Sequence, residues 1–385
     1  MKFTQSIFAA AFAFAAAAAF AAPVTTQGVG VGKHGDIQVA VTFDNGKIQK
    51  IDILKNAENP VLAKKVFTDL KDQIVAANSV QLDGISGATF TSKGLFAAVE
   101  DAAKKAGVTL GQADKKALKA AVKDLPKDAS YDVVVIGAGG AGFSAAIEAK
   151  NAGATVVLLE KMPQVGGNSL ISGAEMNAAK NWVQPKLGIT DDSPELHAKD
   201  TYLGGDKKGD MKVINVMTHN ALAGAEWCRD YLGVRFEPDN LFFFGGHSRK
   251  RALIPVGHTG TEFITKFQAK ADELGIPVIT NMKAEELIKD KSGRVVGVKA
   301  TMNGAEYTFN AKGGVVLATG GFGANPAMVK KYNPKIDERF KTTDAPGTTG
   351  EALYMAQRAG AELVNMQYIQ TYPCLLYTSP SPRDS

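Results

Sequence analysis

A short apolar run that ends in three spaced glycines constrains this chain more than any other stretch. Residues 131–136 are Tyr-Asp-Val-Val-Val-Ile, and Gly137, Gly139 and Gly142 follow in the spacing G-x-G-x-x-G. The first glycine permits a tight turn, the second lets backbone approach a pyrophosphate, and the third lets a helix pack closely on a strand. Free N–H groups at that helix N-terminus attract phosphates. The stretch predicts an α/β domain that binds a dinucleotide.

The residues that follow strengthen this prediction. An alanine-rich helix is expected over 143–152, and a second strand over 154–159 that ends on Glu160. A carboxylate about 20 residues beyond the glycines takes the ribose hydroxyls of the adenosine half. Strand, glycines, helix, strand and acid in this order predict a Rossmann-like, doubly wound fold.

Composition and cysteine usage narrow the function classes. The 385 residues are enough for two or three domains with real cores. The net charge of +5 is spread along the chain, which argues against nucleic-acid binding but allows mild attraction of anionic substrates. Two cysteines, Cys228 and Cys374, cannot build a cysteine metal site, a redox dithiol or a C-x-x-C-H haem attachment. We expect Cys228 to be a core thiol and no metal to be bound.

The first 21 residues are expected to be a cleavable secretory signal. Lys2 supplies a positive start, residues 7–20 are an unbroken apolar run, and Ala19-Phe20-Ala21 gives an A-x-A cleavage site. An uncleaved anchor is the alternative, although a membrane span takes about 20 apolar residues. We expect a periplasmic or otherwise exported protein.

Residues 25–108 are expected to form a small α+β domain. A β-hairpin over 36–54 turns at Asn45-Gly46, and helices are expected over 61–77 and 93–106, with Ser92 as the N-cap of the second. Residues 109–129, rich in lysine and alanine, are expected to be a solvated linker helix.

The segment Asp-Gly-Ile-Ser-Gly-Ala-Thr at 83–89 resembles the flavinylation motif of the small FMN-binding domain of redox-pump subunits and some exported reductases. The resemblance implies that a flavin transferase joins FMN to the Thr89 hydroxyl through a phosphodiester bond. The implied recognition residues are Asp83, Ser86, Gly87 and Ala88. Small residues leave room for a phosphate, and a helix N-terminus favours its charge. The alternative is an ordinary Ser/Gly loop ahead of a capped helix.

Residues 130–373 are expected to form the dinucleotide domain. Strands are expected over 276–280, 284–288 and 295–301, a buried strand over 314–322, and a helix over 352–359. Between them lie glycine-rich loops that let backbone reach a cofactor without interference from a Cβ atom.

Taken together, the blocks of residues 130–373 resemble the soluble fumarate reductase and urocanate reductase family of FAD enzymes. G-A-G-G-A-G, G-G-N-S, S-G-A-E-M-N-A, A-T-G-G-F and M-Q-Y-I-Q occur in the family's order. The resemblance implies non-covalent FAD, electrons that pass from an outside donor to FMN at Thr89 and then to FAD, and reduction of an activated C=C bond in an unsaturated acid. The implied FAD-binding residues are Gly137, Ala138, Gly139, Gly142, Glu160, Lys161, Gly167, Asn168, Ser169, Ser172, Gly173, Asn177, Ala178, Ala284, Thr319, Gly320 and Glu351.

Three departures from the family pattern bear on the substrate and on catalysis. Tyr372 stands where fumarate reductases carry a histidine; tyrosine there resembles urocanate reductase, because a phenol can stack on a flat ring or hydrogen-bond to it. A neutral packing tyrosine is the alternative. Glu351 replaces the usual aspartate. Residues 374–385 do not continue the pattern and are expected to be a non-native tail. The capping domain and the proton-donating arginine would then lie beyond this fragment, which is expected to be inactive.

The basic loop at 245–251 offers His247, Arg249 and Arg251 as substrate ligands, but a solvated turn is the preferred interpretation. The leading hypothesis is an exported 2-enoate reductase, closest to urocanate reductase, fed by a donor such as a membrane quinol-linked cytochrome. A fumarate or acrylate-type reductase is the second enzyme hypothesis. An electron-transfer flavoprotein without a substrate of its own is the hypothesis from another class.

Overall fold

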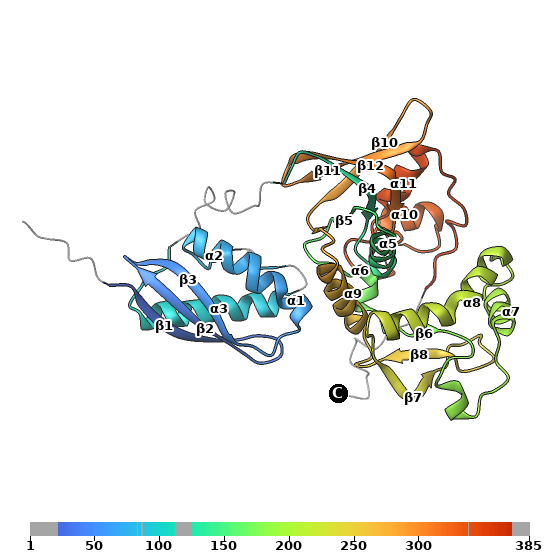
Figure 1. Ribbon diagram of the computed structural model, residues 1–385, viewed down its shortest axis with the longest axis horizontal. Helices are drawn as coiled ribbons and strands as arrows, with labels where there is room; N and C mark the ends of the chain where they lie inside the picture. Colours follow the sequence, from blue (N-terminus) through green and yellow to red (C-terminus); the bar gives the residue numbers. More distant parts are fainter. Residues whose placement is uncertain (1–21, 83, 86–87, 112–124, 338, 372–385) are drawn as a thin grey trace, which may run out of the picture. The chain divides into compact units, whose positions relative to one another are not determined.

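The computed structural model describes residues 22–82, 84–85, 88–111, 125–337 and 339–371. The chain divides into two compact units, Met1–Lys123 and Asp124–Ser385, coloured blue to cyan and green to red in Figure 1. Their boundary falls inside the predicted linker. Among the described helices, none combines the length and the apolar character that a bilayer span requires.

The first unit is a three-stranded antiparallel sheet with helices on one face (Figure 1). The strands, in the order β1-β2-β3, are β1 Val24–Val31, β2 Asp36–Asp44 and β3 Lys47–Lys55. The helical segments are α1 Pro60–Lys65, a π-helical turn Val66–Leu70, α2 Lys71–Ala77 and α3 Thr89–Lys105. Alternate β2 residues from Ile37 to Phe43 are buried against Leu70, Ile74 and Leu95 of these helices. The predicted hairpin is confirmed, with its turn at Asn45-Gly46.

Strand β1 was not predicted, and its glycines explain how it packs. A Cβ atom on Gly28 would lie 1.9 Å from the carbonyl oxygen of Ala98, and one on Gly30 would lie 2.1 Å from that of Gly94. Helix α3 therefore lies directly against the β1 backbone. The same glycines interrupt the alternation of large apolar residues by which a strand is recognised.

The prediction that Ser92 caps the last helix was wrong. Helix α3 begins four residues earlier than predicted, at Thr89, and Ala88 holds the N-cap position. The Ser92 hydroxyl, buried in the first turn, donates to the carbonyl oxygen of Ala88 and accepts from the N–H of Ile85 at 3.0 Å. The helix starts early because Thr91 is also buried there, on the carboxylate of Glu58.

The second unit is built on a six-stranded sheet in the order β10-β11-β12-β4-β5-β9. Strand β4 pairs in parallel with β12 and β5, and β5 with β9, whereas β10, β11 and β12 are antiparallel. The bounds are β4 Asp128–Ile136, β5 Val156–Leu159, β9 Val278–Ile279, β10 Lys283–Lys289, β11 Val295–Met302 and β12 Ala305–Leu317.

Both faces of this sheet are covered. Helix α5 (Gly140–Asn151) packs on β4 and β5, and its Phe143 ring stacks on Phe267 of α9 (Thr261–Glu273). Met355 of α11 (Glu351–Ala359) shares a core with Ile136 of β4. The side chain of the neighbouring residue Val135 points to the opposite face of the sheet, and it is also fully buried. Helices on both faces of a mostly parallel core are typical of the doubly wound fold, which is confirmed.

A smaller antiparallel sheet in the second unit was not predicted. Its order is β6-β8-β7, and its strands are β6 Met176–Asn177, β8 Ala252–Pro255 and β7 Phe236–Phe242. The remaining helical segments are α6 Gly167–Ile171, a 3-10 turn Gln184–Leu187, α7 Pro194–Gly204, α8 Met211–Glu226, a π-helical turn Trp227–Tyr231 and α10 Pro326–Tyr332.

Two predicted elements differ from the structure. Asp128 and Ala129 belong to β4 rather than to the linker helix, because they pair with Thr308 and Phe309 of β12. Residues 112–124 of the linker lie outside the described residues. The strand predicted over 314–322 ends at Leu317, which is 38 % exposed, because β12 reaches the surface at the carboxyl end of the sheet.

Candidate functional site

The glycine turn lies where the carboxyl ends of β4, β5 and β12 meet. The N–H of Gly137 donates to the carbonyl oxygen of Leu159 at 2.7 Å, and that of Ala318 donates to Ile136 at 2.8 Å. Gly137 has a φ of +101°, and a Cβ atom on Gly142 would lie 1.7 Å from the Gly137 carbonyl oxygen. The protein itself therefore requires glycine at the first and third positions.

Gly139 differs from its two neighbours in the motif. Its φ is −87°, and the nearest atom to an added Cβ would be the Ser169 Oγ at 3.6 Å. No described part of the chain thus requires glycine there. An open glycine beside the start of α5 is expected where a pyrophosphate approaches the backbone, so this position fits FAD.

Glu160 directly follows β5 and braces the glycine turn. One carboxylate oxygen accepts from the N–H of Ala138 at 2.9 Å, and the other accepts from that of Met162 at 2.8 Å. Each oxygen keeps a second acceptor position, so the carboxylate can also hold ribose hydroxyls. The N–H of Met282 donates to the Glu160 carbonyl oxygen at 2.9 Å. Ala284 follows two residues after Met282, at the start of β10.

Lys161 and Glu351 form an ion pair between two predicted FAD-binding positions. The Lys161 Nζ lies 2.9 Å from a Glu351 carboxylate oxygen, which also accepts from the Thr349 hydroxyl. Burial alone would raise the pKa of Glu351, but the hydrogen bonds from Thr349 and Lys161 outweigh it and lower the pKa to about 2. The longer side chain at 351 therefore reaches Lys161 as an ionised carboxylate.

The G-G-N-S loop is tied to the segment before α11. Asn168 donates through Nδ2 to the carboxylate of Asp344 at 2.7 Å and accepts through Oδ1 from the N–H of Ala345 at 2.5 Å. The Ser169 hydroxyl accepts from the N–H of Gly140 at 3.1 Å, which joins the loop to the start of α5. Gly167 has a φ of +49°. Asn168 and Ser169 thus shape the site through protein contacts.

The segment from Ser172 to Ala178 reaches the small sheet. Ser172 and Gly173 precede β6, and the Ser172 carbonyl oxygen accepts from the N–H of Gly260 at 2.8 Å. The Oδ1 atom of Asn177 is buried, and no described residue donates to it. A buried acceptor without a protein donor suits a hydrogen bond from a ligand, which is a second point of fit for FAD.

Some of the remaining predicted site residues lie in the described part of the chain, and others lie outside it. Thr319 and Gly320 follow β12, and Gly320 has a φ of +73° at the exposed end of the sheet. Thr89 is the first residue of α3 and is exposed, with buried Ala88 before it. The residues outside the described part of the chain are Tyr372, Asp83, Ser86 and Gly87.

Sequence reasoning missed a buried carboxylate in the first unit. Glu58 is 7 % exposed; its carboxylate accepts from the Thr91 hydroxyl and from the N–H of His34 at 2.8 Å. Gly32 leaves room for it, since a Cβ there would lie 2.5 Å from a Glu58 oxygen. Glu58 thereby holds the first turn of α3, two residues from Thr89.

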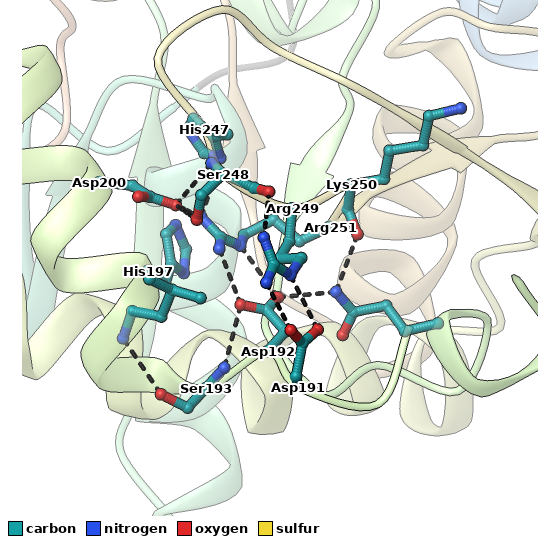
Figure 2. Close-up of polar contacts among 12 residues, drawn as sticks. Asp191, Asp192, Ser193, His197, Asp200, His247, Ser248, Arg249, Lys250 and Arg251 are labelled. Atoms are coloured by element: carbon teal, nitrogen blue, oxygen red, sulfur yellow. Dashed lines mark hydrogen bonds and ion pairs between the residues drawn. The ribbon is translucent and has the colours of Figure 1, made fainter. Parts of the chain in front are cut away.

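The solvated-turn interpretation of the basic loop was wrong for Arg251. Figure 2 shows its guanidinium enclosed by two carboxylates, 2.7 Å from Asp192 Oδ1 and 2.7 Å from Asp200 Oδ2. The side chain is 0 % exposed. His247 lies 3.2 Å from the guanidinium, whereas Arg249 pairs with Asp191 near the surface. The aspartates that bury Arg251 were not singled out in the sequence.

Cys228 is a buried thiol, as predicted, and burial raises its pKa to about 11. Among the residues that the structure describes, no group of three or more His, Cys, Asp or Glu side chains could hold a metal ion.

Comparison with known proteins agrees with the resemblance drawn from the motifs. The family model of the FAD binding domain matches residues 132–383, and that of the FMN-binding domain matches residues 32–104. The chain is 43 % identical to a urocanate reductase of Eggerthella lenta over 351 residues, which is 90 % of this chain and 57 % of that protein. It is 32 % identical to an NADH:acrylate oxidoreductase of Vibrio harveyi, over 89 % of this chain and 40 % of that protein.

A solved structure shares the fold of the second unit. The open conformation of a flavocytochrome c3 fumarate reductase superposes with a TM-score of 0.58 and 32 % identity, over 66 % of this chain and 44 % of that one. The chain spans about half the length of the relatives that it matches. With an open second glycine, a braced acid at the end of β5 and a family match over most of its length, the chain belongs to the FAD binding domain family and carries an FMN-binding domain ahead of it.

Proposed function

We propose that this chain is the flavin-bearing part of an exported reductase that acts on the activated C=C bond of a 2-enoate. Urocanate is the proposed substrate and dihydrourocanate the product. The observation that carries the proposal is the presence in one chain of an FMN-binding unit with Thr89 exposed and an FAD-binding unit with Gly139 open. Two flavins in one chain suit electron transfer from an outside donor to a substrate.

FAD, when bound, supplies the hydride that reduces the double bond. The residues of this chain bind and orient it. Gly139 and the first N–H groups of α5 admit the pyrophosphate, and Glu160 takes the ribose hydroxyls. The buried Oδ1 atom of Asn177 would accept a hydrogen bond from the cofactor, and the ion pair of Lys161 with Glu351 fixes the start of α11.

The Thr89 hydroxyl is the proposed attachment point of FMN. It is exposed at the first residue of α3, where a transferase can reach it. The N–H groups that the first turn of a helix presents favour a phosphodiester, which carries one negative charge. A flavin transferase in the same compartment and an outside donor such as a membrane quinol-linked cytochrome complete the proposed route.

The choice of urocanate rests on Tyr372 and on the similarity to a urocanate reductase. A phenol can stack on an imidazole ring or hydrogen-bond to it, but it cannot replace a cation that clamps a second carboxylate. Reduction of fumarate or an acrylate is the second candidate, because relatives of both names match the chain. An electron carrier without its own substrate is the candidate from another class.

The deciding experiment uses the full-length protein loaded with both flavins. Reduced methyl viologen would be supplied as donor, and its oxidation followed with urocanate, fumarate or acrylate. We expect urocanate to be preferred, and Tyr372→His to shift the preference towards fumarate without loss of FAD. Faster reduction of fumarate by the unaltered protein would reject the tyrosine argument. No oxidation with any of the three acids would favour the electron carrier.

A further inference from the structure

The cluster around Arg251 is the largest buried charged group in the described part of the chain, and the proposed function does not use it. The Arg251 guanidinium contacts Asp192 through Nε at 3.0 Å and Nη2 at 2.7 Å, and Asp200 through Nη1 at 2.7 Å. Asp200 also accepts from the N–H and the hydroxyl of Ser248 (Figure 2). All three nitrogens of the guanidinium thus donate to a carboxylate oxygen.

The backbone of Arg251 connects this cluster to the strand that carries Asn177. The Arg251 carbonyl oxygen accepts from the N–H of Ala178 at 3.0 Å and from Asn181 Nδ2 at 3.1 Å. Asn181 Oδ1 accepts in turn from the N–H of Gln184 at 3.2 Å. The Gln184 side chain then donates to Asp192 at 2.7 Å, which closes a ring of hydrogen bonds back to the guanidinium.

Strand β6 cannot fix its own position. It has two residues, and its pairing with β8 consists of Met176 opposite Leu253 and Asn177 opposite Ala252. A slip of one residue would exchange the faces of Met176 and Asn177, because side chains alternate along a strand. So short a ladder supplies too few hydrogen bonds to exclude that slip. The ring through Arg251 contacts Ala178, the residue directly after β6.

We propose that Arg251, Asp192 and Asp200 are positioning residues that set the register of β6 and so aim Asn177 at FAD. The inference rests on the proposed contact between Asn177 and FAD. A buried ion cluster suits this role, because replacement of such clusters by apolar residues is often neutral or stabilising, whereas directional pairing specifies one arrangement. Burial would raise the pKa values of Asp192 and Asp200, but hydrogen bonds, from Arg251 in both cases, lower them, so both carboxylates are ionised.

The test separates register from stability in the full-length protein. Arg251→Met leaves two buried carboxylates without their partner and is expected to destabilise the second unit. The triple variant Arg251→Met, Asp192→Leu and Asp200→Leu removes all three charges, and we expect it to recover stability to urea. We expect it still to bind FAD about tenfold more weakly, the loss of roughly one hydrogen bond, with an altered near-UV circular dichroism of the bound flavin.

Arg249→Met is the matched control. It removes the neighbouring arginine, whose partner Asp191 is exposed, and should leave FAD binding and the flavin spectrum unchanged. A triple variant with both the stability and the FAD affinity of the unaltered protein would overturn the inference. Asn177→Ala tests the underlying placement separately: normal FAD affinity in that variant would reject the proposed Asn177 contact, whatever the triple variant does.

Discussion

Gly28 and Gly30 of the first unit differ from Gly139 of the second unit in what lies beside them. In the first unit, added Cβ atoms on Gly28 and Gly30 would lie 1.9 and 2.1 Å from carbonyl oxygens of α3, so the protein's own backbone fills the space that these glycines leave. In the second unit, the nearest atom to a Cβ on Gly139 would be 3.6 Å away. An open glycine within the turn at the start of α5 therefore indicates a ligand better than a glycine whose space the described backbone fills.

The units also bury charge differently. Glu58 of the first unit is held by a hydroxyl and a backbone N–H. Arg251 of the second unit is held by two carboxylates and is linked to the backbone beside β6. The first arrangement fixes the start of one helix, whereas the second ties together segments about 50 to 70 residues apart in sequence.

The largest expected effect is on the first unit. Gly28→Ala forces a Cβ into the backbone of α3, and we expect it to lower the free energy of unfolding of that unit by about 3 kcal/mol or more, at the upper end of overpacking. Urea unfolding followed by residue-resolved hydrogen exchange would measure it. Gly111→Ala is the control, because nothing lies within 4 Å of its added Cβ. A loss of less than about 1 kcal/mol in the free energy of unfolding would show that the backbone of α3 does not require glycine at position 28.

The next effect is a pH dependence in the second unit. Burial, with Arg251 and His247 nearby, lowers the pKa of His197 from 6.5 to about 4, although Asp192 and Asp200 oppose this. The unfolded chain binds this proton at a higher pH than the folded chain, so stability falls as the pH drops from about 6.5 to about 4. At 1.36 kcal/mol for each pKa unit, the loss is roughly 3 kcal/mol.

Unfolding midpoints in urea between pH 7 and pH 4 would test this loss. His197→Gln should flatten the pH dependence, whereas replacement of the exposed His219 by glutamine should leave it unchanged. An equally steep dependence in the His197 variant would show that other groups cause it.

A smaller effect is expected at the buried carboxylate of the first unit. Thr91→Val removes the hydroxyl that donates to Glu58, and a hydrogen bond to a charged group contributes about 1.5–3 kcal/mol. Thr91→Ser keeps the hydroxyl and should restore most of the loss in urea unfolding. Equal stability of the valine and serine variants would show that the Glu58 contact contributes little.

The smallest effect on stability is expected at Gly139. Gly139→Ala should change the free energy of unfolding by less than about 1 kcal/mol, because its Cβ meets no described atom closer than 3.6 Å. It should nevertheless weaken FAD binding about tenfold or more, measured by flavin fluorescence titration. Gly204→Ala, also in open space, is the control. Unchanged FAD affinity in the Gly139 variant would remove the contrast between the two units.

Structural features that depend on residues adjacent in the sequence were predictable. The glycine turn, the hairpin at Asn45-Gly46 and the strands expected over 284–288 and 295–301 each follow from a local pattern, and the structure confirms them. Strand β1 was missed because glycines interrupt its alternation. Strand β6 was missed because two residues carry no periodicity.

Contacts between distant residues were not predictable in the same way. The residues next to Arg251 indicate only a basic polar loop. Its partners Asp192 and Asp200 lie 59 and 51 residues earlier in the chain. Ser92 suits an N-cap by its residue type, but burial of Thr91 on Glu58 moves the helix start to Thr89. In both cases a tertiary contact outweighs the local preference.

The proposal that one chain carries both a covalent FMN and a non-covalent FAD is tested most directly by the number of bound flavins and the way each is attached. The full-length protein, produced together with a flavin transferase, would be denatured, and the released flavin and the chain mass would be measured separately. We predict one FAD released for each chain and one FMN retained, with the added mass on the peptide that contains Thr89. A chain without added mass, or release of a single flavin from an unmodified chain, would contradict it.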